Sequence, residues 1–378
     1  MEGDLIHINE WLRPLSWFYE AGVWVRNFMF DNNILKETSF PTPVISVGNL
    51  TVGGTGKTPH TELLIQMLTQ SGMGNPVAVL SRGYKRKSRG FVLANADTPV
   101  RDIGDEPWQM KQKFPETTVA VDANRRRGIA QLIDRLSDAS GQKPVILLDD
   151  AFQHRYVKPC LNILLTDYHR LITDDKMLPA GRLREPVTSK DRAHIVIVTK
   201  CPDNLKPMDY RVIQKALDLK PYQHLFFSTF RYGTLRPLFG KAESRRTVGA
   251  QSSQHDVIIK PEEITPETHV ILLTGIASPQ QMLLDLQQRT RHITPLSFSD
   301  HHDFTSSDAQ KIEKTFTAMQ GSKRLIVTTE KDASRLVLLD GLSPIVRRHI
   351  FVQPIKVEIL QDKEAELATL IQEAIRGL

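Results

Sequence analysis

The sequence is poor in cysteine and has no long apolar run, and both absences narrow what the chain can be. Its two cysteines, Cys160 and Cys201, are far apart and in no spacing typical of a metal site. A disulfide framework is therefore not expected, and a reducing compartment is the simplest interpretation. No stretch approaches 18 uncharged apolar residues, so we expect no helix that spans a bilayer.

The sequence also lacks a secretory signal, repeats and long low-complexity tracts, and what remains is typical of an ordinary globular protein. The first residues include Glu2 and Asp4 and no basic segment, so no secretory signal is expected. The sequence shows no internal repeat and no long low-complexity tract. Its 378 residues, 40% hydrophobic and 24% charged, suit two domains with real cores. A net charge of +6 favours an anionic partner such as nucleic acid, phospholipid or a phosphorylated substrate.

Residues 11–31 hold three of the four tryptophans and have the periodicity of an amphipathic helix. One face is apolar and the other polar, with Trp17 and Trp24 at the border, an arrangement that suits the headgroup region of a membrane. Packing against the protein's own core is the alternative. Arg26 lies within the apolar face and argues against a core position, because a buried unpaired charge is costly. Lipid phosphate or an acidic partner would accommodate it. The sequence pattern of residues 1–31 leaves membrane association and core packing open at this point.

A glycine-dense segment after a β-branched strand predicts a phosphate-binding loop. The strand begins at Val44, and the loop ends in Lys57 and Thr58 at a helix start. Glycines let successive backbone N–H groups surround a polyphosphate, Lys57 would reach the β- and γ-phosphates, and the Thr58 hydroxyl would bind Mg²⁺. Thr51 replaces the first glycine of the strict motif, so the fit is to a deviant P-loop. The predicted nucleotide-binding residues are Gly53, Gly54, Thr55, Gly56, Lys57 and Thr58.

Short apolar strands alternate with helices along most of the chain, which predicts an α/β fold with a doubly wound, mainly parallel sheet. The expected strands of the first lobe are 76–80, 118–121, 145–148, 161–165 and 194–198, with helices at 61–70 and 125–136. A second βα series begins near residue 270. We therefore predict a P-loop lobe over 32–222 and a smaller α/β lobe over 223–378. Strands 225–232 and 350–357 would form a β-ribbon between the lobes, and a terminal helix would close the second.

Two carboxylates, Asp149 and Asp150, follow the apolar strand at 145–148 as in a Walker B motif. Such acids bind Mg²⁺ directly or through water, close to Thr58. Gln153 and His154 come next and could orient water or substrate; a satisfied structural histidine is an equal interpretation of His154.

Two further clusters contain candidate acid–base groups. The acidic turn Gly104–Pro107 could orient an acceptor hydroxyl and take its proton. The His/Asp cluster at 299–304 could bind a metal, or could supply a histidine partner for that acid, and the motif alone leaves both open. Basic runs at 81–87, 124–127 and 182–184 are either solvated surface or contacts for phosphates.

Several of these segments together resemble the tetraacyldisaccharide 4′-kinase family. The segments in family order are Arg13–Trp17, Val47–Pro59, Ser81–Tyr84, Gly104–Pro107, Leu148–His154, Leu178–Pro186, Thr274–Ala277, Asp300–His302 and Thr328–Asp332. Two departures are mild: Ala151 replaces a usual glycine, and Arg182 a frequent proline. The resemblance covers nearly the whole chain.

The resemblance implies transfer of the γ-phosphate of ATP, with Mg²⁺, to the 4′-hydroxyl of a tetraacylated glucosamine disaccharide 1-phosphate in lipid A biosynthesis. It implies Asp105 as catalytic base with His301 as its partner. The other implied roles are Arg125 and Arg184 at phosphates, Ser81 and Tyr84 at the nucleotide or acceptor, and Asp149, Asp150 and Glu185 at the metal. The resemblance also implies that residues 1–31 are a membrane-associating element, because the acyl chains of the acceptor lie in the bilayer. The expected place is the cytoplasmic face of the bacterial inner membrane, bound peripherally to an anionic leaflet and a membrane-embedded glycolipid, with no nucleic acid partner.

Two rival hypotheses come from other classes. A P-loop ligase acting on a small acid would not need the tryptophan-rich helix. A nucleotide switch or metallochaperone would use the His/Asp cluster at 299–304 to bind metal and would form no phosphorylated product.

Overall fold

The structure is a computed structural model that describes residues 8–70, 76–137, 143–239, 258–276, 279–300, 302–321 and 323–377. The chain divides into two compact units, residues 1–230 with 357–378 and residues 231–356. This differs from the predicted division at 222/223, and it places the C-terminal helix in the first unit. The reason is packing: Leu367 and Ile371 of α12 (Glu364–Arg376) are buried in the core of the first unit.

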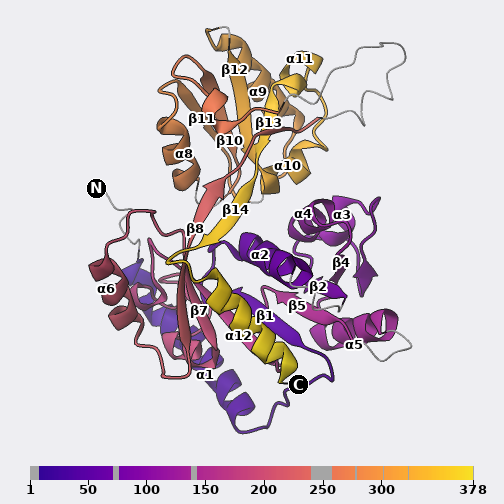
Figure 1. Cartoon of the computed structure of the whole chain (residues 1–378), viewed down its shortest axis with the longest axis vertical. Helices are drawn as coiled ribbons and strands as arrows, with labels where there is room; N and C mark the ends of the chain where they lie inside the picture. The colour runs from indigo at the N-terminus through magenta and orange to yellow at the C-terminus, as the bar shows by residue number, and fades with distance from the viewer. Residues whose placement is uncertain are drawn as a thin grey trace. The chain divides into compact units, whose positions relative to one another are not determined.

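The first unit is built on a sheet of nine strands in the order β14-β8-β7-β6-β1-β5-β2-β4-β3 (Figure 1). Its strands are β1 (Val44–Asn49), β2 (Val77–Ser81), β3 (Val92–Leu93), β4 (Thr118–Val121), β5 (Val145–Asp149), β6 (Leu161–Asp167), β7 (Ile195–Thr199), β8 (His224–Tyr232) and β14 (Ile355–Ile359). The ladders from β8 through β1 to β4 are parallel, and the β3–β4 pair is antiparallel. The predicted doubly wound, mainly parallel sheet is confirmed.

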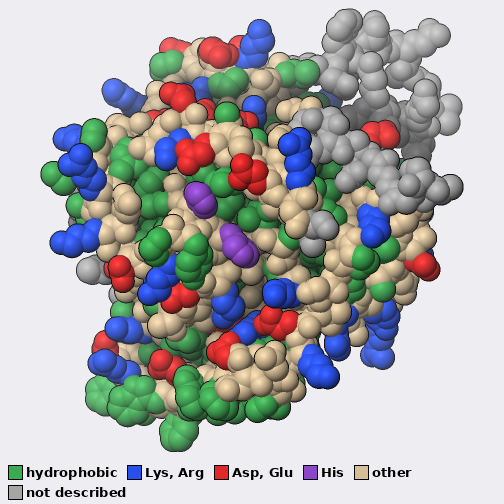
Figure 2. Space-filling model, turned by 60° about the horizontal axis from the view of Figure 1, so that its bottom comes forward, with side chains coloured by type: hydrophobic (Ala, Val, Ile, Leu, Met, Phe, Trp, Pro, Cys, Tyr) green, Lys and Arg blue, Asp and Glu red, His purple; other side chains and the backbone are tan. Residues whose placement is uncertain are grey.

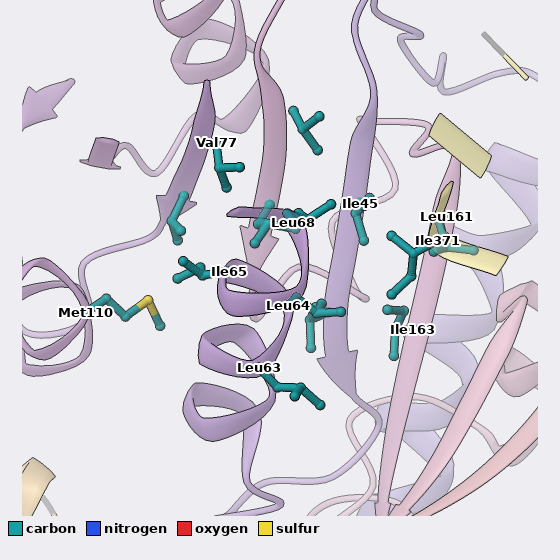
Figure 3. Packing of buried hydrophobic residues seen from close by; sticks show 14 of the residues in the cluster. Ile45, Leu63, Leu64, Ile65, Leu68, Val77, Met110, Leu161, Ile163 and Ile371 are labelled. Atoms are coloured by element: carbon teal, nitrogen blue, oxygen red, sulfur yellow. The ribbon is translucent and has the colours of Figure 1, made fainter. Parts of the chain in front are cut away.

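Helices cover both faces of this sheet, because alternate residues of each buried strand point to opposite sides. Ile45 and Val47 of β1 pack with α2, α4 and α12, whereas Val44 packs with α5. The helices are α1 (Arg13–Asp31), α2 (Lys57–Gln70), α3 (Val100–Ile103), α4 (Asp105–Lys113), α5 (Arg125–Leu136), α6 (Pro207–Leu217) and α12. Figure 3 shows the side of the core where Leu64 and Leu68 of α2 approach Ile45.

Two strands connect the units. The unit boundaries fall within β8 and within β14, and these strands are neighbours in the first sheet. The predicted β-ribbon is therefore present. The expected strand 350–357 is split into β13 (Ile350–Gln353) and β14 by Pro354, which has no N–H to give to a ladder.

The second unit contains a five-stranded sheet in the order β11-β10-β12-β13-β9. Its remaining elements are β9 (Arg236–Pro237), β10 (His269–Thr274), β11 (Ile293–Ser297), β12 (Arg324–Thr329), α8 (Gln280–Gln287), α9 (Ser306–Ala318), α10 (Glu330–Leu336) and α11 (Pro344–Arg348). All ladders are parallel except that between β13 and β9. The second α/β lobe is thus confirmed as a sheet with its own core. The polar stretch 241–254 lies outside the described residues.

Helix α1 exposes most of its large apolar side chains, and its buried side is narrow and partly polar. Trp11, in the short 3-10 helix Glu10–Leu12 before α1, is 93% exposed, and the exposed apolar side chains of α1 are Leu15, Trp17, Phe18, Tyr19, Trp24, Val25 and Phe28. Ser16 and Phe30 are the buried residues of the helix, so its buried side includes a polar residue. Figure 2 shows hydrophobic side chains gathered along the lower edge of the view. Within the described ranges, no helix has the length and apolar character to cross a membrane.

Candidate active site

The phosphate-binding loop lies between β1 and α2, at the carboxyl end of the central strand of the first sheet. Gly53 and Gly56 have φ of +116° and +83°, a region that favours glycine. A Cβ at Gly56 would also approach the Phe230 ring to 2.8 Å. The loop is held at Thr55 by two hydrogen bonds: Asn49 Nδ2 donates to Thr55 Oγ1 at 2.8 Å, and Thr199 Oγ1 donates to the Thr55 carbonyl at 2.9 Å. This part of the chain has the strand–loop–helix form of a P-loop.

Lys57 opens α2 and points toward the acids that follow β5. Its Nζ donates to Asn49 Oδ1 at 3.4 Å and lies 3.7 Å from Asp150 Oδ1. Thr58, half-buried, is the next residue in the first helical turn. Gly54 is exposed at the crest of the loop. The loop therefore brings a lysine, a hydroxyl and a helix N-terminus to one place, which is the chemistry that a polyphosphate requires.

We call the P-loop residues 53–58 together with Asp149 and Asp150 the nucleotide corner. His60 lies beside it and was not predicted from the sequence. Its Nδ1–H donates to the Gly56 carbonyl at 2.7 Å, and its Nε2 accepts from Ser228 Oγ at 2.8 Å. Burial lowers the pKa of His60 to about 4, against the opposing effect of the Gly56 carbonyl, so the ring is neutral. The sequence could have pointed to His60 by its position, because it follows Gly56 by four residues and so lies one helical turn from it on the P-loop helix.

The two carboxylates after β5 have opposite electrostatic environments. Asp149 is 1% exposed and accepts from Ser81 Oγ and Thr61 Oγ1, each at 3.3 Å. Burial, followed by the charges of Glu106 and Asp150, raises the pKa of Asp149 to about 7. Asp150 has φ of +47°.

Burial also acts to raise the pKa of Asp150, but the nearby charges of Lys57 and Arg184 outweigh it and hold the pKa below its usual value. Arg184 Nη1 lies 3.3 Å from both Asp150 carboxylate oxygens. One acid of the pair is thus ionised, and the other takes up a proton easily until a cation arrives.

Arg125 lies directly behind this pair. It is 3% exposed, its Nη1 donates to the Asp122 carbonyl at 2.7 Å, and its Nη2 donates to the Asp149 carbonyl at 3.3 Å. Burial is the main reason that its pKa falls to about 10. Its buried Nε has no hydrogen-bond partner among the described residues. Its role at a phosphate stays a prediction.

The acidic turn and the Ser81–Lys87 segment lie side by side. Gly104 has φ of +91°, and a Cβ there would meet the Tyr84 carbonyl at 2.8 Å. The Lys87 N–H donates to the Arg101 carbonyl at 2.7 Å. Asp105 is the first residue of α4, and the next residue, Glu106, acts electrostatically on Asp149.

Packing thus brings Ser81 to Asp149. The neighbours of Asp105 on either side, Gly104 and Glu106, approach the Tyr84 carbonyl and act on Asp149, respectively. Tyr84 is an exposed member of the same segment as Ser81. The influence of Glu106 on Asp149 was not foreseen, because it depends on how α4 is placed against the sheet.

Glu185 is held by two arginines. It is 1% exposed; Arg26 Nη1 of α1 donates to its Oε1 at 3.4 Å, and Arg192 Nη2 donates to its Oε2. Arg26 therefore has the acidic partner that its place in the apolar sequence face required. Each carboxylate oxygen keeps a second lone pair, so a role for Glu185 at a metal stays a prediction.

His154, next to this group, is half-buried. Burial and the positive charges of Arg125 and Arg26 lower its pKa to about 4. Its buried Nε2 has no hydrogen-bond partner within the described part of the chain. Gln153 instead donates through Nε2 to the Asn49 carbonyl. A buried Nε2 without a partner among the described residues does not fit a satisfied structural histidine, and a role for His154 in orienting water or substrate stays a prediction.

The predicted partner histidine, His301, lies outside the described residues. Its neighbour His302 is held in the second unit: its Nε2 lies 3.0 Å from Asp308 Oδ2, and its ring stacks on Phe298. Arg335 Nη1 donates to the His302 carbonyl at 2.8 Å and its Nη2 to Asp332 Oδ1 at 2.8 Å. The loop around residue 302 is thereby anchored to α10.

The donor set after β5 suits Mg²⁺ better than a transition metal. Over the described ranges, no group of three or more His, Cys, Asp or Glu side chains is arranged to hold a metal ion. Mg²⁺ is commonly bound by one or two carboxylates together with substrate phosphates and water. Asp149, Asp150 and the Thr58 hydroxyl supply oxygen donors of that kind next to the P-loop.

Comparison with known proteins gives one consistent family. A family model described as tetraacyldisaccharide-1-P 4′-kinase matches residues 8–376. The chain is 52% identical over 376 residues to a tetraacyldisaccharide 4′-kinase of Phocaeicola vulgatus, covering 100% of this chain and 98% of that protein. It is 53% identical over 364 residues to the protein of the same name from Bacteroides thetaiotaomicron, covering 96% and 92%.

A solved structure agrees. The LpxK protein of Aquifex aeolicus, crystallised in complex with ATP, matches with a TM-score of 0.68 and 27% identity, covering 97% of this chain and 99% of that one. The P-loop, the paired acids after β5 and the acidic turn at the start of α4 are thus found in a chain that matches this family over nearly its whole length. The chain belongs to the tetraacyldisaccharide-1-phosphate 4′-kinase family.

Proposed function

We propose that this kinase transfers the γ-phosphate of ATP to the 4′-hydroxyl of a tetraacylated glucosamine disaccharide 1-phosphate in lipid A biosynthesis. The family membership supports the activity. The observation that carries the assignment to this site is the corner where Lys57 lies 3.7 Å from Asp150, between the P-loop and the end of β5. A ligase or a switch would leave unexplained why the whole chain matches this family.

The proposed nucleotide site uses the first unit. Backbone N–H groups of Gly53–Gly56 and the Lys57 ammonium group would bind the β- and γ-phosphates, and Arg184, paired with Asp150, could turn to a phosphate oxygen. Thr58, Asp149 and Asp150 would hold Mg²⁺. When bound, this ion would offset the negative charge on the transferred phosphoryl group and on the leaving ADP.

The proposed acceptor chemistry uses Asp105. Its carboxylate takes the proton from the 4′-hydroxyl while that oxygen forms a bond to the γ-phosphorus; the bond to the β–γ bridging oxygen breaks, and ADP leaves. Ser81 and Tyr84, on the segment beside the Gly104 turn, would contact the acceptor or nucleotide. His301 would partner Asp105.

We also propose that α1 docks on the anionic cytoplasmic face of the bacterial inner membrane, where the acyl chains of the acceptor lie. Exposed Trp17, Phe18 and Trp24 would enter the headgroup region. The net charge of +6 favours an anionic surface.

The test is transfer of label from γ-labelled ATP to tetraacyldisaccharide 1-phosphate in mixed micelles with Mg²⁺, using wild type and Asp105→Asn. Wild type should label the lipid, and the Asp105→Asn variant should do so about 10²- to 10⁴-fold more slowly, because a positioned base contributes that range. An Asp97→Asn variant, at an exposed loop position, is the matched control. No transfer by wild type that binds ATP would refute the assignment of the acceptor.

A further inference from the structure

Helix α1 is joined by side-chain hydrogen bonds to the loop that carries Arg184 and Glu185. Ser16 Oγ donates to the Met177 carbonyl at 3.0 Å, near the N-terminal end of the helix. One turn later Tyr19 Oη donates to the Arg184 carbonyl at 3.0 Å. Two turns further along, Arg26 Nη1 donates to Glu185. These contacts lie on one side of the helix, whereas the side chains of Trp17 and Trp24 are exposed.

The same loop is bonded on its other side to the P-loop. The Arg184 N–H donates to the Leu50 carbonyl at 2.7 Å, and the Val52 N–H donates to the Arg182 carbonyl at 2.7 Å. Thr51 and Leu183 form an antiparallel bridge between these two pairs. The backbone around Arg184 therefore lies between α1 and the start of the phosphate-binding loop and is hydrogen-bonded to both.

Arg26 makes a second connection to the nucleotide corner. Its Nη2 donates to the Gln153 carbonyl at 2.7 Å, and Gln153 Nε2 donates to the Asn49 carbonyl. Asn49 in turn bonds Thr55 and Lys57. A single guanidinium thus holds Glu185 on one side and the segment after the paired acids on the other. Its planar set of donors can serve two acceptors in fixed directions, which a lysine cannot do.

We propose that Arg26 is a positioning residue through which α1 sets the geometry of the nucleotide corner, so that docking of α1 on a lipid surface and binding of Mg–ATP are coupled. A lipid surface that holds α1 in place would hold Arg184 and Gln153 in place as well. By thermodynamic reciprocity, Mg–ATP would strengthen docking by the same factor. The lipid half of this proposal rests on the proposed function, whereas the positioning of the nucleotide corner by Arg26 does not.

The first experiment needs no lipid. The dissociation constant of Mg–ATP is measured for the full-length chain as wild type, Arg26→Ala, Arg26→Lys and Arg13→Ala. Arg13 is the matched control, because it is an exposed arginine on the same helix whose ion pair is with Glu10. Arg26→Ala should weaken Mg–ATP binding about 10-fold, within the usual range for coupled sites. Arg26→Lys should recover part of the loss, and Arg13→Ala should behave as wild type.

A melting temperature separates positioning from mere folding. If Arg26→Ala lowers the melting temperature but leaves the Mg–ATP dissociation constant unchanged, the residue is only structural and the proposal is overturned. An equal loss in Arg13→Ala would also overturn it, because the effect would then be a property of helix charge.

The second experiment adds vesicles of phosphatidylcholine and phosphatidylglycerol that contain no acceptor. Wild type should bind Mg–ATP about 5-fold more tightly with vesicles, whereas Arg26→Ala should bind the vesicles yet show no tightening. Equal tightening in both would refute the coupling. If wild type does not bind vesicles, docking and coupling fail together, and the lipid-free comparison still decides whether Arg26 positions the nucleotide corner.

Discussion

The nucleotide corner and helix α1 depart from ordinary burial in opposite directions. In the corner, ionisable side chains such as Asp149 and Arg125 are withdrawn from water, whereas on α1 Trp17 and Phe18 are left in it. Each arrangement is unfavourable without a partner: a buried carboxylate needs a cation or donors, and a large exposed apolar patch needs a surface to cover it. The difference teaches that the two regions are prepared for two kinds of ligand, a charged one inside and an apolar one outside.

The two regions also differ in how they are held. The corner is held by opposite charges, as between Asp150 and the cations of Lys57 and Arg184. Helix α1 is held along a narrow strip by Ser16, Tyr19 and Arg26, most of whose partners are backbone carbonyls. Changes in the corner should therefore act mainly on chemistry, and changes on the outer face of α1 should act mainly on docking.

The largest expected effect comes from removing the charge of the corner. Lys57→Ala should lower kcat by on the order of 10³-fold, because the lysine would stabilise charge on the transferring phosphate. Label transfer from ATP to the lipid acceptor measures it, with Lys215→Ala on exposed α6 as control. A near-normal rate would contradict the view that the nucleotide corner is prepared for a charged ligand, since the corner would then not bind the transferred phosphate.

The buried acid should give the next effect, on stability. Because the pKa of Asp149 is raised from 3.8 to about 7, the unfolded chain loses this proton near pH 4 while the folded chain keeps it until about pH 7. Folding stability should fall by up to a few kcal/mol as pH rises through that window, and Asp149→Asn should remove the fall. Thermal unfolding of the protein without Mg²⁺ or ATP from pH 4 to 8 measures it. Parallel profiles for the two proteins would contradict the shift.

The apolar half of the comparison is tested on the outer face of α1. Trp17→Ala with Trp24→Ala should weaken binding to anionic vesicles about 10-fold or more, because two large side chains no longer leave water. Co-sedimentation with vesicles measures it. Ile345→Ala, an exposed apolar residue of the second unit, is the control. Unchanged binding by the double variant would show that α1 is covered by something other than lipid.

The smallest expected effect concerns charge at the membrane. Raising the salt concentration from about 0.1 M to about 0.5 M should weaken vesicle binding several-fold, because the basic surface of a chain with net charge +6 is screened. The same change should leave binding to uncharged phosphatidylcholine vesicles unaffected. Identical salt dependence with both kinds of vesicle would show that charge does not contribute to docking and that α1 binds through its apolar side chains alone.

Much of the corner could be predicted because its signals are local. The glycines at 53–56, the Lys57–Thr58 pair and the acids at the end of β5 each follow a strand, and strands of a parallel sheet end at the same edge. The contacts of Arg26, Glu106 and His60 could not be predicted. Arg26 meets a residue 159 positions away, and no periodicity in either segment specifies that contact.

The faces of α1 show why periodicity alone was insufficient. The hydrophobic pattern indicated an amphipathic helix, and the structure has a helix at Arg13–Asp31. Which face is buried depended on the surface opposite it: the Met177 carbonyl and the Ala180 N–H satisfy Ser16 and make a polar residue suitable for burial. Trp17, Phe18 and Trp24 are not on this side of the helix and remain exposed.

The sequence by itself determined the α/β class, the P-loop, the paired acids and the tryptophan-rich helix, because each depends on residue types and spacings within one or two neighbouring elements. Only the tertiary structure decided that α12 completes the first unit, that Glu185 lies between Arg26 and Arg192, and that the pKa of Asp149 is raised to about 7. Those facts depend on burial and on charges brought together from distant parts of the chain, and both are properties of packing and not of sequence order.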